Sequence, residues 1–271
     1  MESNSSTTID LEKIITDRAG KGRVPHFLIG WARKFLHEDF INGYLFQGYT
    51  GVDFCENCMK YLDVTINVEG MDNLDGYPDD ARFTFVSNHP LGGIDGIALG
   101  MVFGRRFDGR IKYLVNDFLM NVGGIAPLCV PINMIGSQSR DLPARLDEAF
   151  GSANQVIMFP AGLCSRKIDG VIQDRAWGKA FINKSVQTGR YVVPVHFIGR
   201  NSNRFYRIAR LCKLLKLKFN FAMLCLPDEM YRGRHGSYTV RIGKPVPASS
   251  FDSTRSAWDW AQWVRAQVYS L

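Results

Sequence analysis

The stretch FTFVSNHPLGGIDGIALG, residues 83–100, passes from an apolar run through a glycine-rich turn into a second apolar run. The first run, FTFVSN, is rich in aromatic and β-branched residues and predicts a buried strand. A helix is expected to begin near Ile94 or Asp95 and to continue through GIALGMVFG. His89 therefore lies just past the carboxyl end of a strand, in the turn that leads to a helix.

The same alternation of strand and helix continues along the chain. Strand-like runs that end in or contain Gly, Pro, Asn or Asp are YLDVTINVEG, IKYLVND, LCVPIN, NQVIMFP, RYVVPVHFIG and SYTVRIGKPV. Helical patterns lie between them, for example DLPARLDEAFGSA and RAWGKAFINKSVQTG. This order predicts an α/β fold with a mostly parallel central sheet flanked by helices. In such sheets ligands bind beyond the carboxyl ends of the strands, where His89 is expected.

The N-terminal part has a different character. Residues 1–22 are polar, and residues 24–46 carry apolar residues at helical spacing with basic residues among them. This pattern predicts an amphipathic helical segment, either one helix or two joined near Asn42-Gly43. The segment either packs on the body of the protein or lies on a membrane surface. We divide the chain into this N-terminal segment, residues 1–60, and a main domain, residues 61–271.

Composition limits the classes of protein and of partner. The 271 residues are 46% hydrophobic, which suits a large core, and the net charge of +7 attracts anions such as nucleic acid, lipid headgroups or an acidic carrier protein. No secretory signal and no apolar stretch of about 18 residues is visible, so we expect a cytoplasmic protein without a transmembrane helix. The only close pair among the six cysteines is Cys55 and Cys58. Without a second pair, reduced cysteines are expected rather than a metal or redox site.

His89 and Asp95 form a candidate proton-transfer pair. Because they are six positions apart, they meet only if the Pro-Leu-Gly-Gly segment between them folds back. A histidine that donates one ring N–H to a carboxylate keeps its other nitrogen as an acceptor for a hydroxyl proton. The alternative is a structural histidine, with Asp95 at a helix N-terminus where a carboxylate is favourable. Spacing alone leaves both interpretations open.

A second strand end, VIMFPAGLCSR, is a candidate anion site. Pro160 and Gly162 predict a turn, and Ser165 and Arg166 follow it. A glycine turn followed by a hydroxyl and a guanidinium can hold a phosphate or a carboxylate. The alternative is an ordinary Pro-Gly turn beside a surface arginine.

Taken together, the two segments resemble one family. NHPLGGIDG, followed about seventy residues later by FPAGLCSR, is similar to the lysophospholipid acyltransferase superfamily, which includes the bacterial 1-acyl-glycerol-3-phosphate acyltransferases. That family has N-H-x-x-x-x-D, then F-P-E-G-T-x-S-R, then a strand with an internal proline, which YVVPVHF matches. VRIGKPVP resembles the closing strand of the family, so the resemblance spans residues 61–247 and implies a glycerolipid acyltransferase-like fold.

The resemblance implies a role for each matched residue. His89 is the general base, and Asp95 orients it. The base takes a proton from an acceptor hydroxyl, which attacks a fatty acyl thioester of acyl carrier protein or coenzyme A, with no other cofactor and no metal. The residues implied to bind substrate are Asn88, Gly92, Gly93, Pro160, Gly162, Ser165 and Arg166. From the conformational freedom of glycine we further infer that backbone N–H groups around Gly92 and Gly93 stabilise the thioester oxyanion.

Departures from the family pattern concern the acceptor. Five residues separate His89 from Asp95, where the family has four, and Ala161 stands where a glutamate is usual. Both features resemble a hemolysin-like branch related to O-acyltransferases of ornithine and glycine lipids. An arginine expected between the two motifs is also missing, because Pro131-Ile132-Asn133 lies near its place. The resemblance therefore implies an O-acyltransferase of a lyso-lipid such as lyso-ornithine or lyso-glycine lipid, with lysophosphatidate as the alternative acceptor.

Further basic residues are candidate contacts for anions. The pattern DRAWGKAFINKS puts Arg175 and Lys179 on one helix face, either as headgroup contacts or as solvated charges. Residues 204–219 carry six basic and no acidic residues. Their apolar stripe consists of Phe205, Ile208, Cys212, Leu215 and Phe219. We expect residues 24–46 and 204–219 to bind the inner face of a membrane, or the second helix to dock acyl carrier protein; a core-packed helix with solvated lysines is the alternative.

Other classes of protein fit the sequence less well. The G-x-S-x-G elbow of an α/β-hydrolase and the phosphate-binding G-x-x-x-x-G-K-[ST] loop are both missing from the sequence. A basic module that binds anions or nucleic acid explains the charge, but it does not explain a His/Asp pair and an anion loop at strand ends. We therefore expect an enzyme, with no nucleic-acid partner.

Overall fold

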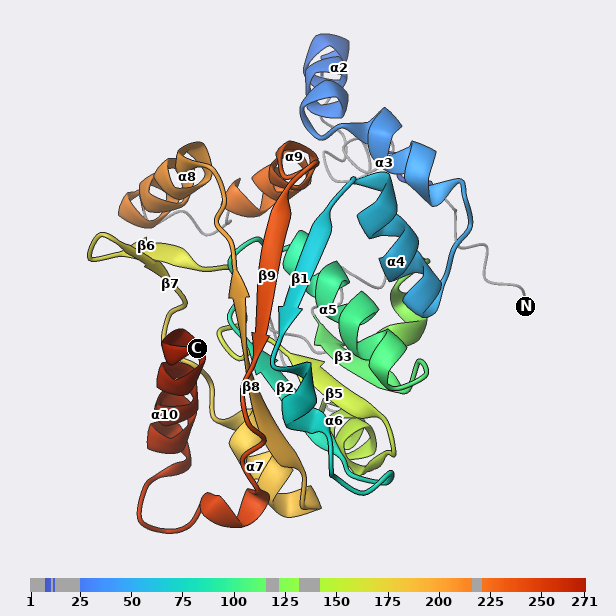
Figure 1. The fold of residues 1–271 in the computed structure, drawn as a ribbon. Coiled ribbons are helices and arrows are strands. Elements are labelled where there is room, and N and C mark those ends of the chain that lie inside the picture. Colours follow the sequence, from blue (N-terminus) through green and yellow to red (C-terminus); the bar gives the residue numbers. More distant parts are fainter. Residues whose placement is uncertain (1–7, 11, 13–24, 116–121, 132–141, 216–220) are drawn as a thin grey trace.

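The structure is a computed structural model that describes residues 8–10, 12, 25–115, 122–131, 142–215 and 221–271. Within these residues a seven-stranded sheet forms the centre of the molecule (Figure 1). Its strands are β1 (Thr65–Glu69), β2 (Phe83–Ser87), β3 (Ile111–Val115), β4 (Cys129–Pro131), β5 (Gln155–Met158), β8 (Tyr191–Ile198) and β9 (Ser237–Ile242). Their order across the sheet is β1-β9-β8-β2-β5-β3-β4.

The sheet is mostly parallel, as the sequence predicts. Of the six strand pairings described in this sheet, that of β8 with β9 is antiparallel, so that β1 and β9 run opposite to the other strands. Strand β2 lies between β8 and β5 and is parallel to both, with Val86 opposite Pro194 and Met158. The turns that follow β2 and β5 therefore open at the same edge of the sheet, which brings the two sequence motifs together.

Helices cover both faces of the sheet. One face carries α4 (Gly51–Tyr61) and α5 (Ile94–Arg106), and the other carries α6 (Leu142–Gly151), α7 (Ala180–Thr188) and α10 (Ala257–Ser270). Along β2 the side chains alternate between these layers: Phe83 and Phe85 pack with α4 and α5, whereas Val86 packs with α6, α7 and α10. The central strands are thus apolar on both faces, as buried parallel strands require.

The remaining elements gather at the end of the sheet toward which β2 and β8 point, the upper end in Figure 1. They are α2 (His26–Phe35), α3 (Glu38–Leu45), α8 (Asn203–Leu214), α9 (Leu226–Arg232) and the hairpin of β6 (Arg166–Ile168) with β7 (Val171–Gln173). Short 3-10 helices are η1 (Met71–Leu74), η3 (Ala126–Leu128), η4 (Phe221–Cys225) and η5 (Ala248–Ser250).

The N-terminal amphipathic segment forms two helices, but the predicted junction between them is wrong. Asn42 and Gly43 lie inside α3, and the break falls at His37. His37 has a left-handed backbone with a φ of 54°, and its Nε2 lies 2.9 Å from Oδ1 of Asp228 in α9. A contact with a residue so distant in the sequence fixes this break, and the local pattern does not reveal it.

Near residue 175 the structure differs from one local prediction and contains one element that was not predicted. Helix α7 begins at Ala180, with Lys179 as its N-cap, so Arg175 and Lys179 do not share a helix face. Arg175 instead donates from Nε to the backbone oxygen of Ala161 at 2.7 Å. The β6–β7 hairpin has no counterpart in the sequence prediction, because strands of three residues carry too little pattern to be recognised.

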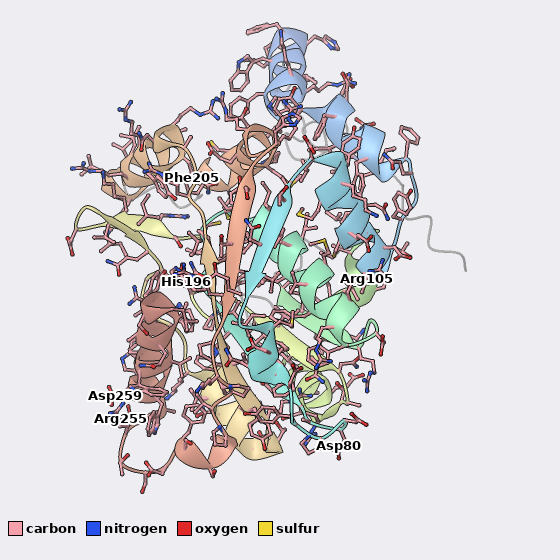
Figure 2. The ribbon with its side chains drawn as sticks, viewed as in Figure 1. Asp80, Arg105, His196, Phe205, Arg255 and Asp259 are labelled. Atoms are coloured by element: carbon pink, nitrogen blue, oxygen red, sulfur yellow. The ribbon has the colours of Figure 1, made fainter. Side chains whose placement is uncertain are left out.

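Helix α8 turns part of its apolar stripe inward. Phe205 and Cys212 are buried, and Phe205 lies between α8 and the β6–β7 hairpin (Figure 2). Leu215, just after the helix, is 57% exposed. The core-packed alternative therefore holds for the first part of the stripe but not for Leu215. Phe219 lies outside the described residues.

Helix α4 crosses the boundary at residue 60 that divides the two segments of the sequence analysis. Its Phe54, Cys55 and Met59 are buried in the same apolar cluster as α5. The boundary itself stays a prediction. Cys55 and Cys58 are free thiols, as are the other four cysteines. Among the described residues, no helix has the length and apolar character needed to cross a membrane.

Candidate active site

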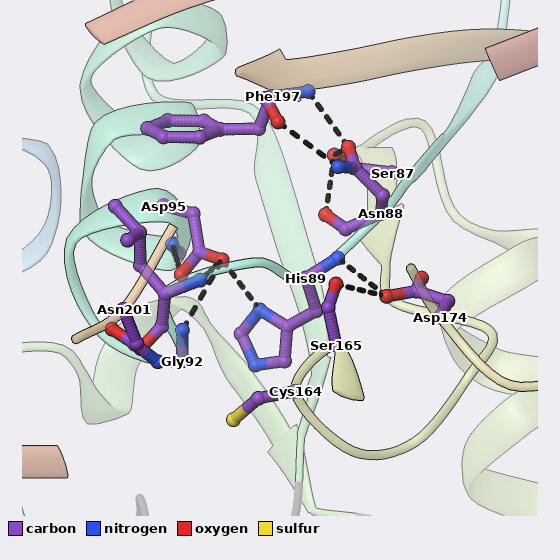
Figure 3. Close-up of polar contacts among 12 residues, drawn as sticks. Ser87, Asn88, His89, Gly92, Asp95, Cys164, Ser165, Asp174, Phe197 and Asn201 are labelled. Atoms are coloured by element: carbon purple, nitrogen blue, oxygen red, sulfur yellow. Dashed lines mark hydrogen bonds and ion pairs between the residues drawn. The ribbon is translucent and has the colours of Figure 1, made fainter. Parts of the chain in front are cut away.

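His89 lies at the carboxyl end of the central strand β2, and the preceding residue, Asn88, fixes this end of the strand. Asn88 is buried, and its Oδ1 accepts from the backbone N–H of Phe197 at 2.7 Å while its Nδ2 donates to the Phe197 oxygen at 2.9 Å (Figure 3). This contact ties the end of β2 to the end of β8. The side chain of Asn88, for which the family resemblance implies substrate binding, is engaged in holding the two strands together.

The turn folds back so that His89 meets Asp95. Nδ1 of His89 lies 3.0 Å from Oδ2 of Asp95, which is fully buried in the first turn of α5. The same carboxylate accepts from the backbone N–H groups of Leu91 at 2.9 Å, Gly92 at 3.2 Å and Gly96 at 2.9 Å. Gly92 has a φ of 78°, a conformation that glycine adopts at little cost. The extra residue in the spacer is therefore absorbed by the turn.

The surroundings of Asp95 fix its ionisation. Burial alone raises the pKa of Asp95, but the imidazole of His89 and the backbone donors outweigh burial and hold this pKa below its usual value. An ionised carboxylate only accepts, so Nδ1 of His89 carries the proton that it donates to Asp95. Nε2 is then the unprotonated nitrogen, as a general base requires.

The pKa of His89 is also shifted. Burial lowers the pKa of His89, but the charge and hydrogen bond of Asp95 outweigh burial and raise it above the usual histidine value. Phe159, just after β5, stacks on the imidazole with 4.0 Å between ring centroids and 26° between planes. The side chain of His89 is still 18% exposed, so it remains accessible to a substrate.

The FPAG segment is bonded directly to the histidine turn. The backbone N–H of Ser165 donates to the His89 oxygen at 2.7 Å, and Gly162, with a φ of 69°, donates its N–H to the Phe159 oxygen at 2.9 Å. Pro160 accepts from the N–H of Gly178 at 3.0 Å. The structure thus brings the two predicted motifs into one site, although they lie far apart in the sequence.

Ser165 and Arg166 lie at this site in different roles. The Ser165 hydroxyl is buried and donates to Oδ1 of Asp174 at 2.6 Å. Arg166 is half-buried; its Nη1 donates to the backbone oxygens of Cys164 at 2.7 Å and Ser165 at 3.2 Å, and its guanidinium lies over the ring of Phe205. A guanidinium has five N–H donors, so Arg166 can also bind an anionic ligand.

One inference about the oxyanion needs correction. The N–H of Gly92 donates to Asp95, so it is directed into the protein and not toward a substrate. The oxyanion role of this N–H rests only on the conformational freedom of glycine. That freedom does not determine the direction in which the N–H points. Gly93 precedes the first residue of α5, and the N-terminus of that helix supplies partial positive charge at the turn.

Asp174 is the site residue that the sequence does not reveal. It follows the unpredicted β6–β7 hairpin and is 1% exposed, next to both motifs. Its short-range pattern, QDRAW, looks like the start of a surface helix. The part of the chain that the structure describes contains no group of three His, Cys, Asp or Glu side chains that could hold a metal ion.

Comparison with known proteins agrees with this geometry. The sequence model of a family described as Acyltransferase matches residues 14–271. Two curated proteins, each named Lyso-glycine lipid O-acyltransferase, align over this whole chain. The one from Phocaeicola vulgatus is 49% identical over 98% of its length, and the one from Bacteroides thetaiotaomicron is 50% identical over 100% of its length.

A solved structure supports the fold. The crystal structure of the 1-acyl-sn-glycerophosphate (LPA) acyltransferase PlsC from Thermotoga maritima superposes with a TM-score of 0.51 and covers 81% of this chain and 77% of its own. At 20% identity it supports the fold alone. The resemblance read from the two motifs is confirmed by the family match and the full-length relatives: the chain belongs to the acyltransferase family and is an acyltransferase.

Proposed function

We propose that this enzyme moves a fatty acyl group from a thioester to the hydroxyl of lyso-glycine lipid. The observation that supports lyso-glycine lipid as the acceptor is the pair of full-length relatives, about 50% identical, whose names specify this lipid. The absence of a family glutamate at Ala161 also favours an acceptor other than lysophosphatidate. Lysophosphatidate is the rival acceptor that the resemblance of the two motifs implies.

In this mechanism His89 moves the proton and the chain forms no covalent acyl intermediate. Nε2 takes the proton of the acceptor hydroxyl while its oxygen attacks the thioester carbonyl, and Asp95 stabilises the resulting imidazolium. The tetrahedral intermediate collapses to the new ester by breaking the C–S bond. The departing thiolate then takes the proton from Nε2, which restores neutral His89.

Arg166 is our candidate for recognition of the acceptor. A glycine lipid carries a carboxylate, and a guanidinium binds a carboxylate through paired hydrogen bonds. The guanidinium of Arg166 is held by two backbone oxygens and the Phe205 ring, so it loses little freedom on binding. It follows directly after Ser165, whose backbone is bonded to His89.

The lipid substrates imply a membrane surface, and we propose that α2 and α8 bind it at the inner face. On α2, Phe27 is 73% and Trp31 is 63% exposed. Leu211 and Leu214 of α8 are 53% and 74% exposed, beside the exposed cations Arg207, Arg210 and Lys213. The guanidinium of Arg204 in α8 lies over the ring of Phe35 in α2, so the two helices meet. The acyl donor would be acyl carrier protein or coenzyme A thioester.

A competition assay tests the acceptor. The purified protein receives acyl carrier protein or coenzyme A thioester together with lyso-glycine lipid, lyso-ornithine lipid and lysophosphatidate, and mass spectrometry identifies the esters. We expect esterified glycine lipid to dominate and to disappear with His89→Ala. Exclusive use of lysophosphatidate would overturn the acceptor but keep the chemistry. Full activity in His89→Ala would overturn the mechanism.

A further inference from the structure

Asp174 lies at the junction of the two motifs and is not explained by the mechanism above. Its Oδ1 accepts from the backbone N–H of His89 at 3.3 Å and from the Ser165 hydroxyl at 2.6 Å, and its Oδ2 accepts from Nε1 of Trp177 at 2.9 Å. Figure 3 shows His89 between two carboxylates, Asp95 at its ring and Asp174 at its backbone. Burial of a carboxylate is costly unless hydrogen bonds compensate it, and these three donors do so for Asp174.

We propose that Asp174 is a positioning residue: its carboxylate fixes the backbone of His89 and Ser165 and, as a second negative charge near the imidazole, strengthens His89 as a base. This inference rests on the proposed function, because it assigns His89 the role of general base. It adds a residue from the hairpin segment to a site otherwise built from the two motifs.

The geometry favours an ionised Asp174. One fixed N–H donor faces each oxygen, from His89 on Oδ1 and from Trp177 on Oδ2. A carboxylate accepts at both oxygens, whereas a protonated acid would turn its O–H toward another donor. Burial raises the pKa of Asp174, and the hydrogen bonds of Ser165 and Trp177 oppose that shift. Asp174 therefore gains its charge at a higher pH than an exposed aspartate does.

The charge of Asp174 acts on His89 in a known direction. The charged groups that face His89 are Asp95 from α5, Asp174 from the hairpin segment and Arg166 from β6. The two carboxylates favour the imidazolium and Arg166 opposes it. Removal of the Asp174 charge therefore lowers the pKa of His89. A role in packing alone would not shift this titration.

The C-terminal helix holds the Asp174 segment from the other side. Nη2 of Arg265 donates to the Asp174 backbone oxygen at 2.6 Å, and the Asp174 N–H donates to the Tyr269 hydroxyl at 2.7 Å. Gln262 accepts from the N–H of Trp177 at 3.1 Å and donates to its oxygen at 2.8 Å. Helix α10 thus anchors the backbone that carries the carboxylate, although α10 contacts neither motif in these bonds.

The test compares Asp174→Asn with Asp169→Asn. Asp169 is an exposed aspartate of the same hairpin with a φ of 48°, a conformation that asparagine tolerates, so its substitution is a matched loss of one charge. For Asp174→Asn we expect kcat to fall about 10- to 100-fold with the acceptor KM unchanged. We also expect the acidic limb of the kcat/KM profile to move to lower pH, with Asp169→Asn like the wild type.

Nuclear magnetic resonance supplies a readout that needs no substrate. The chain has only five histidines, so histidine-labelled protein gives five imidazole titrations, and His89→Ala assigns one of them. The His89 titration should move to lower pH in Asp174→Asn and stay in place in Asp169→Asn. A folded Asp174→Asn protein with the wild-type titration and kcat would overturn the proposal.

If Asp174→Asn does not fold, a second variant, Ser165→Ala, tests the proposal. Ser165→Ala removes one donor from the oxygen that also accepts from His89, and we expect kcat to fall about fivefold, the equivalent of one hydrogen bond, with the acceptor KM unchanged. A wild-type kcat, or a change in KM alone, would overturn the proposal. Activity in His89→Ala would instead contradict the proposed function, so the two failures are distinct.

Discussion

At the scale of single residues, the imidazole of His89 owes its raised pKa and its fixed orientation to the buried carboxylate of Asp95. His235 makes the same kind of contact, with its Nδ1 2.8 Å from Oδ2 of Asp63, but the two side chains are 69% and 79% exposed. Such a pair contributes little in water. The carboxylate of Asp95 is fully buried and accepts from three backbone N–H groups as well, so it holds His89 in one orientation.

The pairing of His89 with Asp95 predicts a pH dependence. The base must be neutral, and its pKa lies above the usual histidine value, so kcat/KM of the wild type should fall as pH drops through that raised pKa. Asp95→Asn removes the charge that stabilises the imidazolium. We expect kcat to fall about 10²- to 10⁴-fold and the acidic limb to move to lower pH. Asp63→Asn, at the exposed pair, is the control, and an unmoved limb in Asp95→Asn would contradict the assignment.

Gly92 allows a second prediction at this scale. A Cβ there would meet Sγ of Cys164 and approach Cδ2 of Leu226 to 2.9 Å, and the φ of 78° is unfavourable for alanine. Gly189 has a φ of 67° with open space around it, so Gly189→Ala isolates the backbone cost of about 1 kcal/mol. We expect Gly92→Ala to lower kcat about tenfold or more and Gly189→Ala to leave it unchanged. Equal kcat values in both variants would show that the close approach is unimportant.

The sequence predicts the contact between His89 and Asp95 but not the hydrogen-bond partners of Asn88 and Ser165. The spacing of His89 and Asp95 around two glycines indicates a turn that folds back, and the structure has that turn. The bonds of Asn88 to Phe197 and of Ser165 to Asp174 join segments that only the folded chain brings together. Neither local pattern nor residue type carries such information, so the partners of these side chains could not be predicted.

At the scale of elements, α9 connects the N-terminal helices to the active-site turn. Asp228 of α9 accepts from His37, at the junction of α2 and α3, and from Arg204 of α8. The opposite side of α9 places Met230 against Gly93 and Leu226 against Gly92. The helices proposed to touch the membrane are therefore fixed to an element that packs on the turn carrying His89.

The exposed face of α2 predicts a measurable effect on vesicle binding. Trp31 is 63% exposed on α2, and Trp258 is 46% exposed on α10, away from the proposed surface. Because a buried indole contributes a few kcal/mol, Trp31→Glu should weaken binding to anionic vesicles at least about tenfold, while Trp258→Glu should not. Cosedimentation with vesicles of defined composition measures both. Equal effects of the two substitutions would argue against α2 as the contact.

Elements with a long, strong hydrophobic pattern are predicted well from the sequence. Short elements, and boundaries that depend on tertiary contacts, are not. The strand before His89 and the helix that begins at Ile94 follow directly from their apolar runs. The break at His37 depends on Asp228, and the late start of α7 depends on side-chain bonds from α10 to the segment before it. Those contacts override the helical pattern of residues 175–179.

At the scale of the whole molecule, acidic partners are unevenly distributed among the cations. Beside α4 and α5, cations are paired, Lys60 with Glu56 and Arg105 with Asp53. The sequence of α8 contains no acidic residue, and its exposed cations lie at the end of the molecule where β2 and β8 point. The exposed cations of α8 therefore lie on the side that we propose to face an anionic lipid surface or an acidic carrier.

Most of the architecture follows from the alternation of strand and helix along the chain. The exception is the position of β9 in the sheet. Right-handed connections between parallel strands make a doubly covered sheet the expected result. The antiparallel entry of β9 between β8 and β1 depends on pairings such as Val195 with Ile242, which no local pattern specifies. This difference leaves the active-site edge unchanged, because β2, β5 and β8 remain parallel.

In the proposed mechanism, His89, held by the fully buried carboxylate of Asp95, takes the proton of a lyso-lipid hydroxyl during acyl transfer. A comparison of His89→Asn with His235→Asn tests this mechanism, since both side chains contact an aspartate through Nδ1, but Asp95 is fully buried and Asp63 is exposed. With lyso-glycine lipid and an acyl thioester, we predict that kcat falls about 10²- to 10⁴-fold in His89→Asn, without loss of folding, and stays at the wild-type value in His235→Asn. Wild-type transfer by folded His89→Asn would contradict the account.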